Sequence, residues 1–202
     1  HALGASGRWQ NSLLRTRIGA EGMDYKGYNI AVHEFGHNVE QTIDLYHIDH
    51  YTLSGVPNTG FTEALAFVFQ KRDLMLMGYD QAVDDNTTLD IFWGLYEIMG
   101  VSLVDMRMWQ WLYAHPDATA QQLREATLAI AKEVWNTYYY PVLGEQDSPI
   151  LACYSHMVNA PMYLPNYPFG HIVEFQLEEH LAQFPTKQAF ADEIMRIYKL
   201  GK

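Results

Sequence analysis

The pentapeptide at residues 33–37, which reads His-Glu-Phe-Gly-His, constrains this chain more than any other stretch. Its two histidines, His33 and His37, are four residues apart. On an α-helix such residues lie on the same face, one turn above the other. Both imidazoles can then aim a nitrogen at one point, an arrangement that suits Zn²⁺. The motif therefore predicts a helix through these residues.

The residues around the motif support a helix from about Met23 to His47. Large apolar side chains recur there at intervals of three or four residues and predict one buried stripe. The stripe consists of Tyr28, Val32, Phe35, Val39, Ile43 and Tyr46. Asp24 is the expected N-cap. Gly36 lowers helix propensity, and we expect it to allow a neighbouring backbone to approach closely.

Glu34 directly follows the first histidine and lies on the flank of the same helix face. From there its carboxylate can reach a metal-bound water without binding the metal, as a general base does. The competing interpretation is a helix with two hydrogen-bonded histidines and a surface glutamate. A third metal ligand further along the chain would favour the first interpretation.

Glu63 is the best candidate for that third ligand. It is the only ionisable residue in the run 60–69, and a lone carboxylate on an apolar helix is unfavourable unless it is paired or binds a metal. The alternative is an acidic residue that the helix dipole favours in the first turn. Two histidines and one glutamate would leave an open coordination position, which is typical of a catalytic zinc.

Other residues near the motif fit a metal less well. The metzincin pattern needs glycine at position 40 and histidine at position 43, where this chain has Glu40 and Ile43, so that class is excluded. Glu40 lies only three residues beyond His37 and would struggle to share a metal with both histidines. His47 and His50 are weaker candidates, because a solvated histidine near a helix C-terminus is favourable without a metal.

Hydrolysis at such a site would use Glu34 to take the proton of the attacking water. The oxyanion that forms on the substrate needs hydrogen-bond donors besides the metal. Candidate donors lie in the segment 154–167, which is rich in tyrosine and contains a histidine and two prolines. On composition alone, ordinary aromatic packing would explain this segment equally well.

The chain predicts a mainly α-helical fold, because no segment alternates clearly between polar and apolar residues. Thr119 and Gln122 form a predicted capping box. We expect at most a short strand in the first thirty residues, an acidic loop over 79–88 and a further loop over 140–149. Besides the motif helix, the expected helices span about 61–77, 89–114, 119–139, 150–157, 169–183 and 187–200.

Composition is that of a globular protein and limits the possible partners. The 202 residues, 49% of them hydrophobic, can bury one core, so we expect a single helical domain over residues 1–202. Because the chain begins with histidine, we interpret it as part of a longer protein. The net charge of −11 at pH 7 argues against nucleic acid, and no apolar run is long enough to span a membrane. Cys153 is expected to be buried.

These motifs together resemble the gluzincin peptidases of the angiotensin-converting enzyme family (peptidyl-dipeptidase A). In that family an HExxH helix is followed by a Gly-Phe-x-Glu-Ala segment that holds the third ligand, and residues 60–64 read Gly-Phe-Thr-Glu-Ala. The order and spacing of His156, Tyr163, Tyr167 and the run 175–181 are also similar. The pentapeptide itself resembles that of thimet oligopeptidase and oligoendopeptidase F.

The resemblance implies a zinc peptidase that acts on short peptides, with Glu34 as general base and acid. It implies that His156 contacts the substrate backbone, that Tyr167 stabilises the oxyanion and that Tyr163 lines the pocket. The fold implied is mainly helical and two-lobed with a deep cleft, and this chain would be its C-terminal, catalytic part. The implied zinc ligands are His33, His37 and Glu63.

Three features depart from the converting-enzyme pattern. Phe67 occupies the position of an aspartate that supports a histidine ligand in that family. Tyr154 occupies the position of a lysine that binds the substrate's terminal carboxylate, so release of C-terminal dipeptides is not implied. The spacing from Tyr163 to Tyr167 is one residue longer, which leaves the roles of the two tyrosines open.

A catalytically inactive relative that retains zinc to bind a peptide or another partner is the alternative to a peptidase. Such relatives usually lose catalytic residues first. The presence of Glu34, His156 and Tyr167 therefore favours the peptidase.

Overall fold

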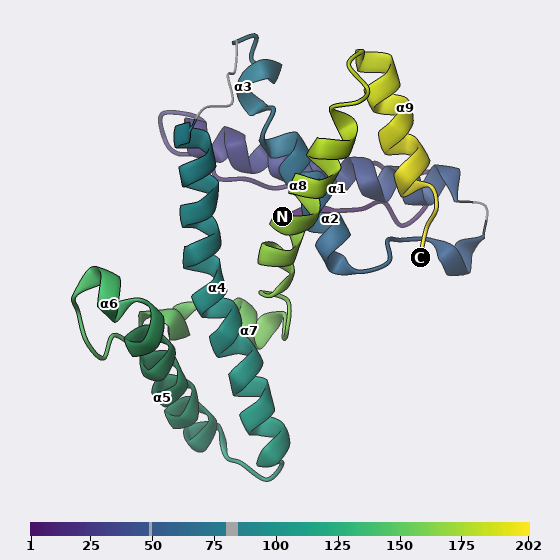
Figure 1. Ribbon diagram of the computed structural model, residues 1–202. Coiled ribbons are helices and arrows are strands. Elements are labelled where there is room, and N and C mark those ends of the chain that lie inside the picture. Colours follow the sequence, from purple (N-terminus) through teal and green to yellow (C-terminus); the bar gives the residue numbers. More distant parts are fainter. Residues whose placement is uncertain (49, 80–84) are drawn as a thin grey trace. The chain divides into compact units, whose positions relative to one another are not determined.

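The computed structural model describes residues 1–48, 50–79 and 85–202 and is mainly helical, which confirms the predicted fold class (Figure 1). The strands β1 (Ala2–Leu3) and β2 (Leu13–Leu14) pair in antiparallel fashion. Among the described residues, no helix combines the length and the apolar character needed to cross a bilayer. The helices are α1 (Tyr25–His47), α2 (Thr59–Gln70), α3 (Asp73–Leu76), α4 (Asp85–Ala114), α5 (Ala120–Tyr138), α6 (Tyr140–Leu143), α7 (His156–Asn159), α8 (Asn166–Leu181) and α9 (Lys187–Tyr198), with 3₁₀ turns at Tyr51–Leu53 and Ile150–Cys153.

The chain divides into two compact units, which we describe separately. Unit 1 consists of residues 1–82 and 169–202, and unit 2 of residues 83–168. This division does not test the expectation of one catalytic domain over residues 1–202, which stays a prediction.

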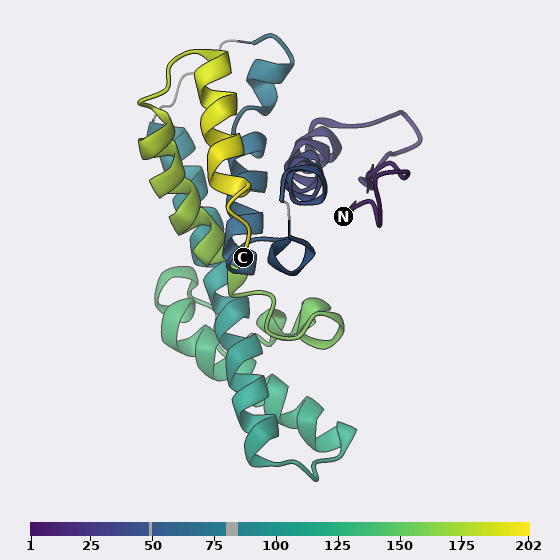
Figure 2. The ribbon, with the colours of Figure 1, turned by 90° about the vertical axis from the view of Figure 1, so that its right-hand side faces the viewer.

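Unit 1 is organised around the close packing of α1 and α2. A Cβ atom at Gly36 would lie 2.7 Å from the Cα of Ala66, so the absence of a side chain there lets the two backbones approach, as predicted. Gly170 does the same for α8, because a Cβ there would lie 2.5 Å from the Cβ of Glu63. Figure 2 shows the N-terminal segment beside α1, in agreement with contacts of both strands to that helix. The core residues are Ile43, Ala64, Leu65, Val68, Leu177, Leu181, Ile194 and Tyr198.

The predicted helix caps are present. The Asp24 carboxylate accepts a hydrogen bond from the backbone N–H of Gly27 at 2.7 Å, and α1 begins at the next residue after this cap. Thr119 and Gln122 form the complete capping box at the start of α5.

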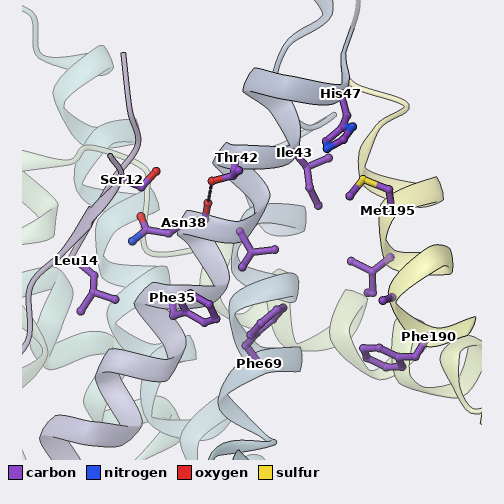
Figure 3. Close-up of a pocket in the computed structure, with 13 residues that line it drawn as sticks. Ser12, Leu14, Phe35, Asn38, Thr42, Ile43, His47, Phe69, Phe190 and Met195 are labelled. Carbon is purple, nitrogen blue, oxygen red and sulfur yellow. Dashed lines mark hydrogen bonds between the residues drawn. The ribbon is translucent and has the colours of Figure 1, made fainter. Parts of the chain in front are cut away.

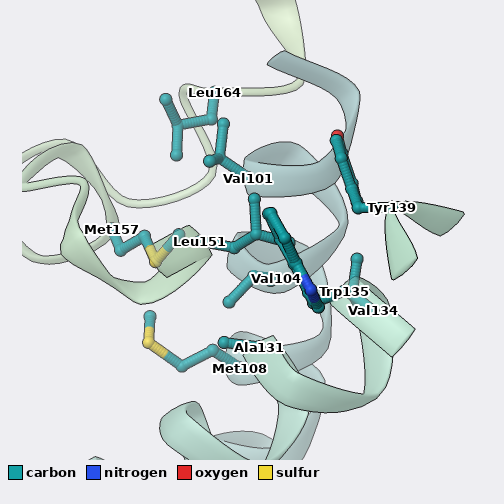
Figure 4. Close-up of a cluster of buried hydrophobic side chains, with 10 residues drawn as sticks. All are labelled: Val101, Val104, Met108, Ala131, Val134, Trp135, Tyr139, Leu151, Met157 and Leu164. Carbon is teal, nitrogen blue, oxygen red and sulfur yellow. The ribbon is translucent and has the colours of Figure 1, made fainter. Parts of the chain in front are cut away.

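Unit 2 packs α4 against α5 around a second core (Figure 4). The Tyr139 hydroxyl accepts a hydrogen bond from the backbone N–H of Gly100 at 2.9 Å, which ties the end of α5 to the middle of α4. Met157 and Leu164 reach into this core from the segment 154–167, which was expected to supply hydrogen-bond donors. The core residues are Val101, Val104, Met108, Ala131, Val134, Trp135, Tyr139, Leu151, Met157 and Leu164.

Two predicted helices differ from the structure. The helix expected over 61–77 is two helices, because the backbone leaves helical geometry at Arg72 (φ −103°, ψ 12°). At the first residue of α3, the buried Asp73 carboxylate accepts a hydrogen bond from the backbone N–H of Leu74. The helix expected over 150–157 is a 3₁₀ turn followed by α7. Conversely, part of the loop expected over 140–149 is helical, because it contains α6 with Pro141 near its start. The acidic loop expected over 79–88 gives way to α4 from Asp85, and residues 80–84 lie outside the described part.

Two burial predictions were wrong. Phe35 and Tyr46 belong to the expected apolar stripe of α1, yet 48% and 44% of their surfaces are exposed, whereas Val32 and Ile43 are buried. The buried face of α1 is partly polar, because it carries groups that interact with α2. Cys153 is exposed rather than buried, since it ends a 3₁₀ turn instead of lying inside a helix.

Candidate metal centre

His33, His37 and Glu63 converge in unit 1, where α1 faces α2. Each offers one ligand atom, and these atoms lie within 4.8 Å of one another. Glu63 Oε2 is 3.4 Å from His33 Nε2 and 3.7 Å from His37 Nε2. Tetrahedral zinc ligands at 2.0–2.2 Å from the metal are separated by roughly 3.3–3.6 Å. Within the described ranges, this is the one such group of three histidine, cysteine or acidic residues, and its two carboxylate–imidazole distances lie close to that separation, so it could hold a metal ion.

Two of these residues, His37 and Glu63, are buried, as expected for metal ligands. Glu63 is 1% exposed and His37 is 8% exposed. Burial lowers the pKa of His37, although the Glu63 carboxylate acts in the opposite direction. The neutral imidazole that results has the lone pair that a metal requires. The His33 and His37 rings meet edge to face, with centroids 4.8 Å apart.

The His33 ring is held by a hydrogen bond on the side away from Glu63. Its Nδ1 lies 2.9 Å from Oε1 of Gln70, and an amide oxygen can only accept. Nδ1 therefore carries the proton, and Nε2 keeps its lone pair toward Glu63. Metal-binding histidines usually have such a partner on the second nitrogen. His37 differs, because its buried Nδ1 has no hydrogen-bond partner among the described residues.

Glu34 is not one of the three converging residues. It lies on α1 between the two histidines, and its charge raises the pKa of His37. Glu34 Oε1 is also 2.5 Å from the terminal amine of His1. The role of Glu34 as a base beside the metal position stays a prediction.

The other proposed ligands lie apart from this group. His47 lines an apolar pocket of about 690 Å³, and neither His33, His37 nor Glu63 is among its lining residues (Figure 3). Phe35, Phe69 and Met195 line the same pocket, and His47 itself is exposed to solvent. His50 follows α1 and belongs to no metal-binding group in the described part of the chain.

Glu40 is buried but belongs to a different cluster. It is 4% exposed, and its Oε2 accepts a hydrogen bond from the Thr62 hydroxyl at 2.7 Å. Burial raises the pKa of Glu40 to about 8, and a hydrogen bond with Asp44 adds to this effect. The raised pKa favours the protonated carboxyl group, which makes Glu40 a poor metal ligand.

The Glu40→Gln variant is expected to change how the stability of the metal-free protein depends on pH. The folded-state pKa of about 8 lies above the ordinary value of 4.5, so between these values the folded state holds a proton that the unfolded state has lost. This contribution is complete at low pH and falls as the pH rises through the folded pKa, by at most about 1.4 kcal/mol per pH unit. The variant should therefore gain thermal stability relative to the parent at alkaline pH but not in acid.

Thermal unfolding followed by circular dichroism between about pH 4 and pH 9 would measure this difference. The matched control is Glu179→Gln, which changes an exposed glutamate of α8 in the same unit. A constant difference in melting temperature between Glu40→Gln and the parent over the whole pH range would contradict the assignment.

The three predicted substrate-binding residues lie close together in unit 2. The His156 ring is 6.3 Å from the rings of both Tyr163 and Tyr167, and the two tyrosine rings are 5.5 Å apart. The buried carboxylate of Asp105 on α4 supports their loop, because its Oδ1 accepts from the backbone N–H of Met162 at 3.4 Å. The structure thus gathers the predicted histidine and tyrosines into one aromatic cluster.

Sequence reasoning missed several polar residues beside the metal-binding group. Gln70 follows Glu63 by seven residues and Asn29 precedes His33 by four, so helical spacing could have placed both on the faces that carry the ligands. His171 is a different case: its ring stacks on Phe67 with a centroid distance of 3.7 Å, and burial lowers its pKa to about 4. It lies on α8, and no spacing from the motif could have indicated it.

Comparisons of the chain with known protein families, with curated proteins and with solved structures gave no match.

Proposed function

We propose that this protein is a zinc metallopeptidase that hydrolyses short peptides. The observation that supports the proposal most strongly is the convergence of His33, His37 and Glu63, with the Glu63 carboxylate 3.4 Å and 3.7 Å from the two imidazole nitrogens, as a group that could hold a metal ion. Three ligands leave one position for water, as catalytic zinc sites require. The preference for short peptides comes from the resemblance to gluzincins.

Each proposed catalytic residue has a task that its chemistry can perform. When bound, zinc would polarise the substrate carbonyl and acidify a water molecule. Glu34 takes the proton of the attacking water and delivers it to the leaving amine. The resemblance to gluzincins assigns to His156 and Tyr167 hydrogen bonds to the substrate backbone and to the oxyanion that forms from the carbonyl oxygen, and it assigns Tyr163 to the lining of the pocket.

Metal analysis combined with a peptidase assay tests the proposal. We expect the purified protein to contain about one zinc per chain and to cleave members of a diverse library of short peptides. The chelator 1,10-phenanthroline should abolish cleavage, and added zinc should restore it. Bound zinc without hydrolysis of any peptide would instead support a zinc-containing binding domain, and no zinc above background would remove both functions.

A further inference from the structure

We propose that Asp73 controls which nitrogen of His33 carries the proton, acting through a chain of hydrogen bonds that passes through Asn29 and Gln70. Asp73 would thereby be a positioning residue for the metal site, although it does not touch the metal ligands. The consequence for zinc depends on the proposed function, whereas the consequence for the His33 ring does not.

Four side chains form a continuous hydrogen-bonded chain within unit 1. His33 Nδ1 lies 2.9 Å from Gln70 Oε1. Gln70 Nε2 donates to Asn29 Oδ1 at 2.5 Å, and Asn29 Nδ2 donates to Asp73 Oδ2 at 2.7 Å. The chain thus runs from α1 to α2, back to α1, and ends at α3.

Asp73 can act only as an acceptor at the end of this chain. It is 2% exposed, and both of its carboxylate oxygens already accept other hydrogen bonds. Oδ2 accepts from the Tyr25 hydroxyl at 2.7 Å, and Oδ1 accepts from the backbone N–H of Leu74 at 2.5 Å. The hydrogen bond between Tyr25 and Asp73 is the main reason why the pKa of Tyr25 is raised to about 12, as expected for a hydroxyl that donates to a carboxylate.

Because Asp73 can only accept, it determines the direction of every hydrogen bond between itself and His33. A primary amide has one donor group and one acceptor group, so Asn29 must turn its NH₂ toward Asp73 and its oxygen toward Gln70. Gln70 must then turn its NH₂ toward Asn29 and its oxygen toward His33. Reversing either amide would place donor against donor or acceptor against acceptor in a part-buried site, which is unfavourable.

The direction of these hydrogen bonds allows only one tautomer of the His33 ring. Nδ1 must carry the proton, and Nε2 must keep its lone pair, 3.4 Å from Glu63 Oε2. This is the tautomer in which Nε2 can bind a metal. His37 serves as an internal comparison, because its Nδ1 has no partner among the described residues and the chain does not reach it.

The Asp73→Asn variant tests the inference, because the new amide has almost the same shape but can also donate. Both intermediate amides can then reverse, which would present the Gln70 NH₂ to His33 Nδ1 and favour the tautomer with the proton on Nε2. We expect long-range ¹H–¹⁵N correlation spectra of the metal-free protein to show this shift for His33 and not for His37. We expect the Kd for zinc, measured by chelator competition, to rise about 10- to 100-fold. Asp192→Asn, at an exposed position of α9, is the control.

A second substitution distinguishes this role from a general loss of packing. Adding Gln70→Glu to Asp73→Asn places a carboxylate beside His33, which accepts from Nδ1–H whatever the direction of the remaining chain. The double variant should therefore regain zinc affinity to within about threefold of the parent, although it contains one more change. A folded double variant that stays as weak as Asp73→Asn would overturn the inference.

The unmodified protein supplies a test that needs neither a variant nor zinc. A metal-free spectrum in which His33 carries its proton on Nε2 would overturn the inference directly, and so would unchanged tautomer and zinc affinity in Asp73→Asn. If the parent bound no zinc, the proposed function would fail. The spectrum of His33 would still decide whether the chain sets its tautomer.

Discussion

Replacing Glu34 by glutamine is expected to lower kcat for peptide hydrolysis by about 10²- to 10⁴-fold, the usual contribution of a general base, while zinc stays bound. Glutamine has nearly the same shape but cannot take the proton of the attacking water. The metal should remain because the three converging ligands do not include Glu34. Kinetics with a peptide identified in the library assay, together with the metal content of the same sample, would measure both effects.

The control for this experiment is Glu179→Gln, the same change at an exposed position, which should leave kcat and metal content as in the parent. Loss of zinc from Glu34→Gln would show that Glu34 is a ligand and would exclude its assignment as the base. Retention of full activity would assign the base to another residue.

The sequence predicted those parts of the site that depend on helix geometry alone. The spacing of His33 and His37 placed them on one face of α1, and the isolated position of Glu63 indicated a buried carboxylate. Gly36 was expected at a close helix contact, where it lies. In each case the prediction needed only the position of a residue on a helix, a property that sequence spacing determines.

The rest of the site depends on packing between elements, which spacing alone does not determine. Phe35 fits the apolar stripe of α1 by its position, yet it is largely exposed because the buried face of this helix contains polar groups such as Glu40. The break between α2 and α3 arises because Asp73 is buried against Tyr25 and Asn29 of α1. No local signal in the run 61–77 indicates that contact.

Glu63→Gln is expected to have the largest effect on zinc binding. The substitution keeps the volume of this buried side chain but removes the anionic ligand that lies 3.4 Å and 3.7 Å from the two histidine nitrogens. We expect the Kd for zinc to rise more than about 100-fold, because loss of a ligand should exceed the 10- to 100-fold effect of losing a residue that only supports one. Chelator competition on folded protein would measure the change.

Glu40→Gln is the matched control for this variant, since it makes the same change in another buried glutamate of unit 1. Glu40 is bound to Thr62 rather than directed at the histidines, so the Kd for zinc in this variant should stay within about threefold of the parent value. Suppose that zinc affinity were unchanged in Glu63→Gln but weakened when His47 or His50 is replaced. The third ligand would then be one of these histidines at the end of α1 and not Glu63. That result would contradict the convergence of α1 and α2 as the basis of the metal site.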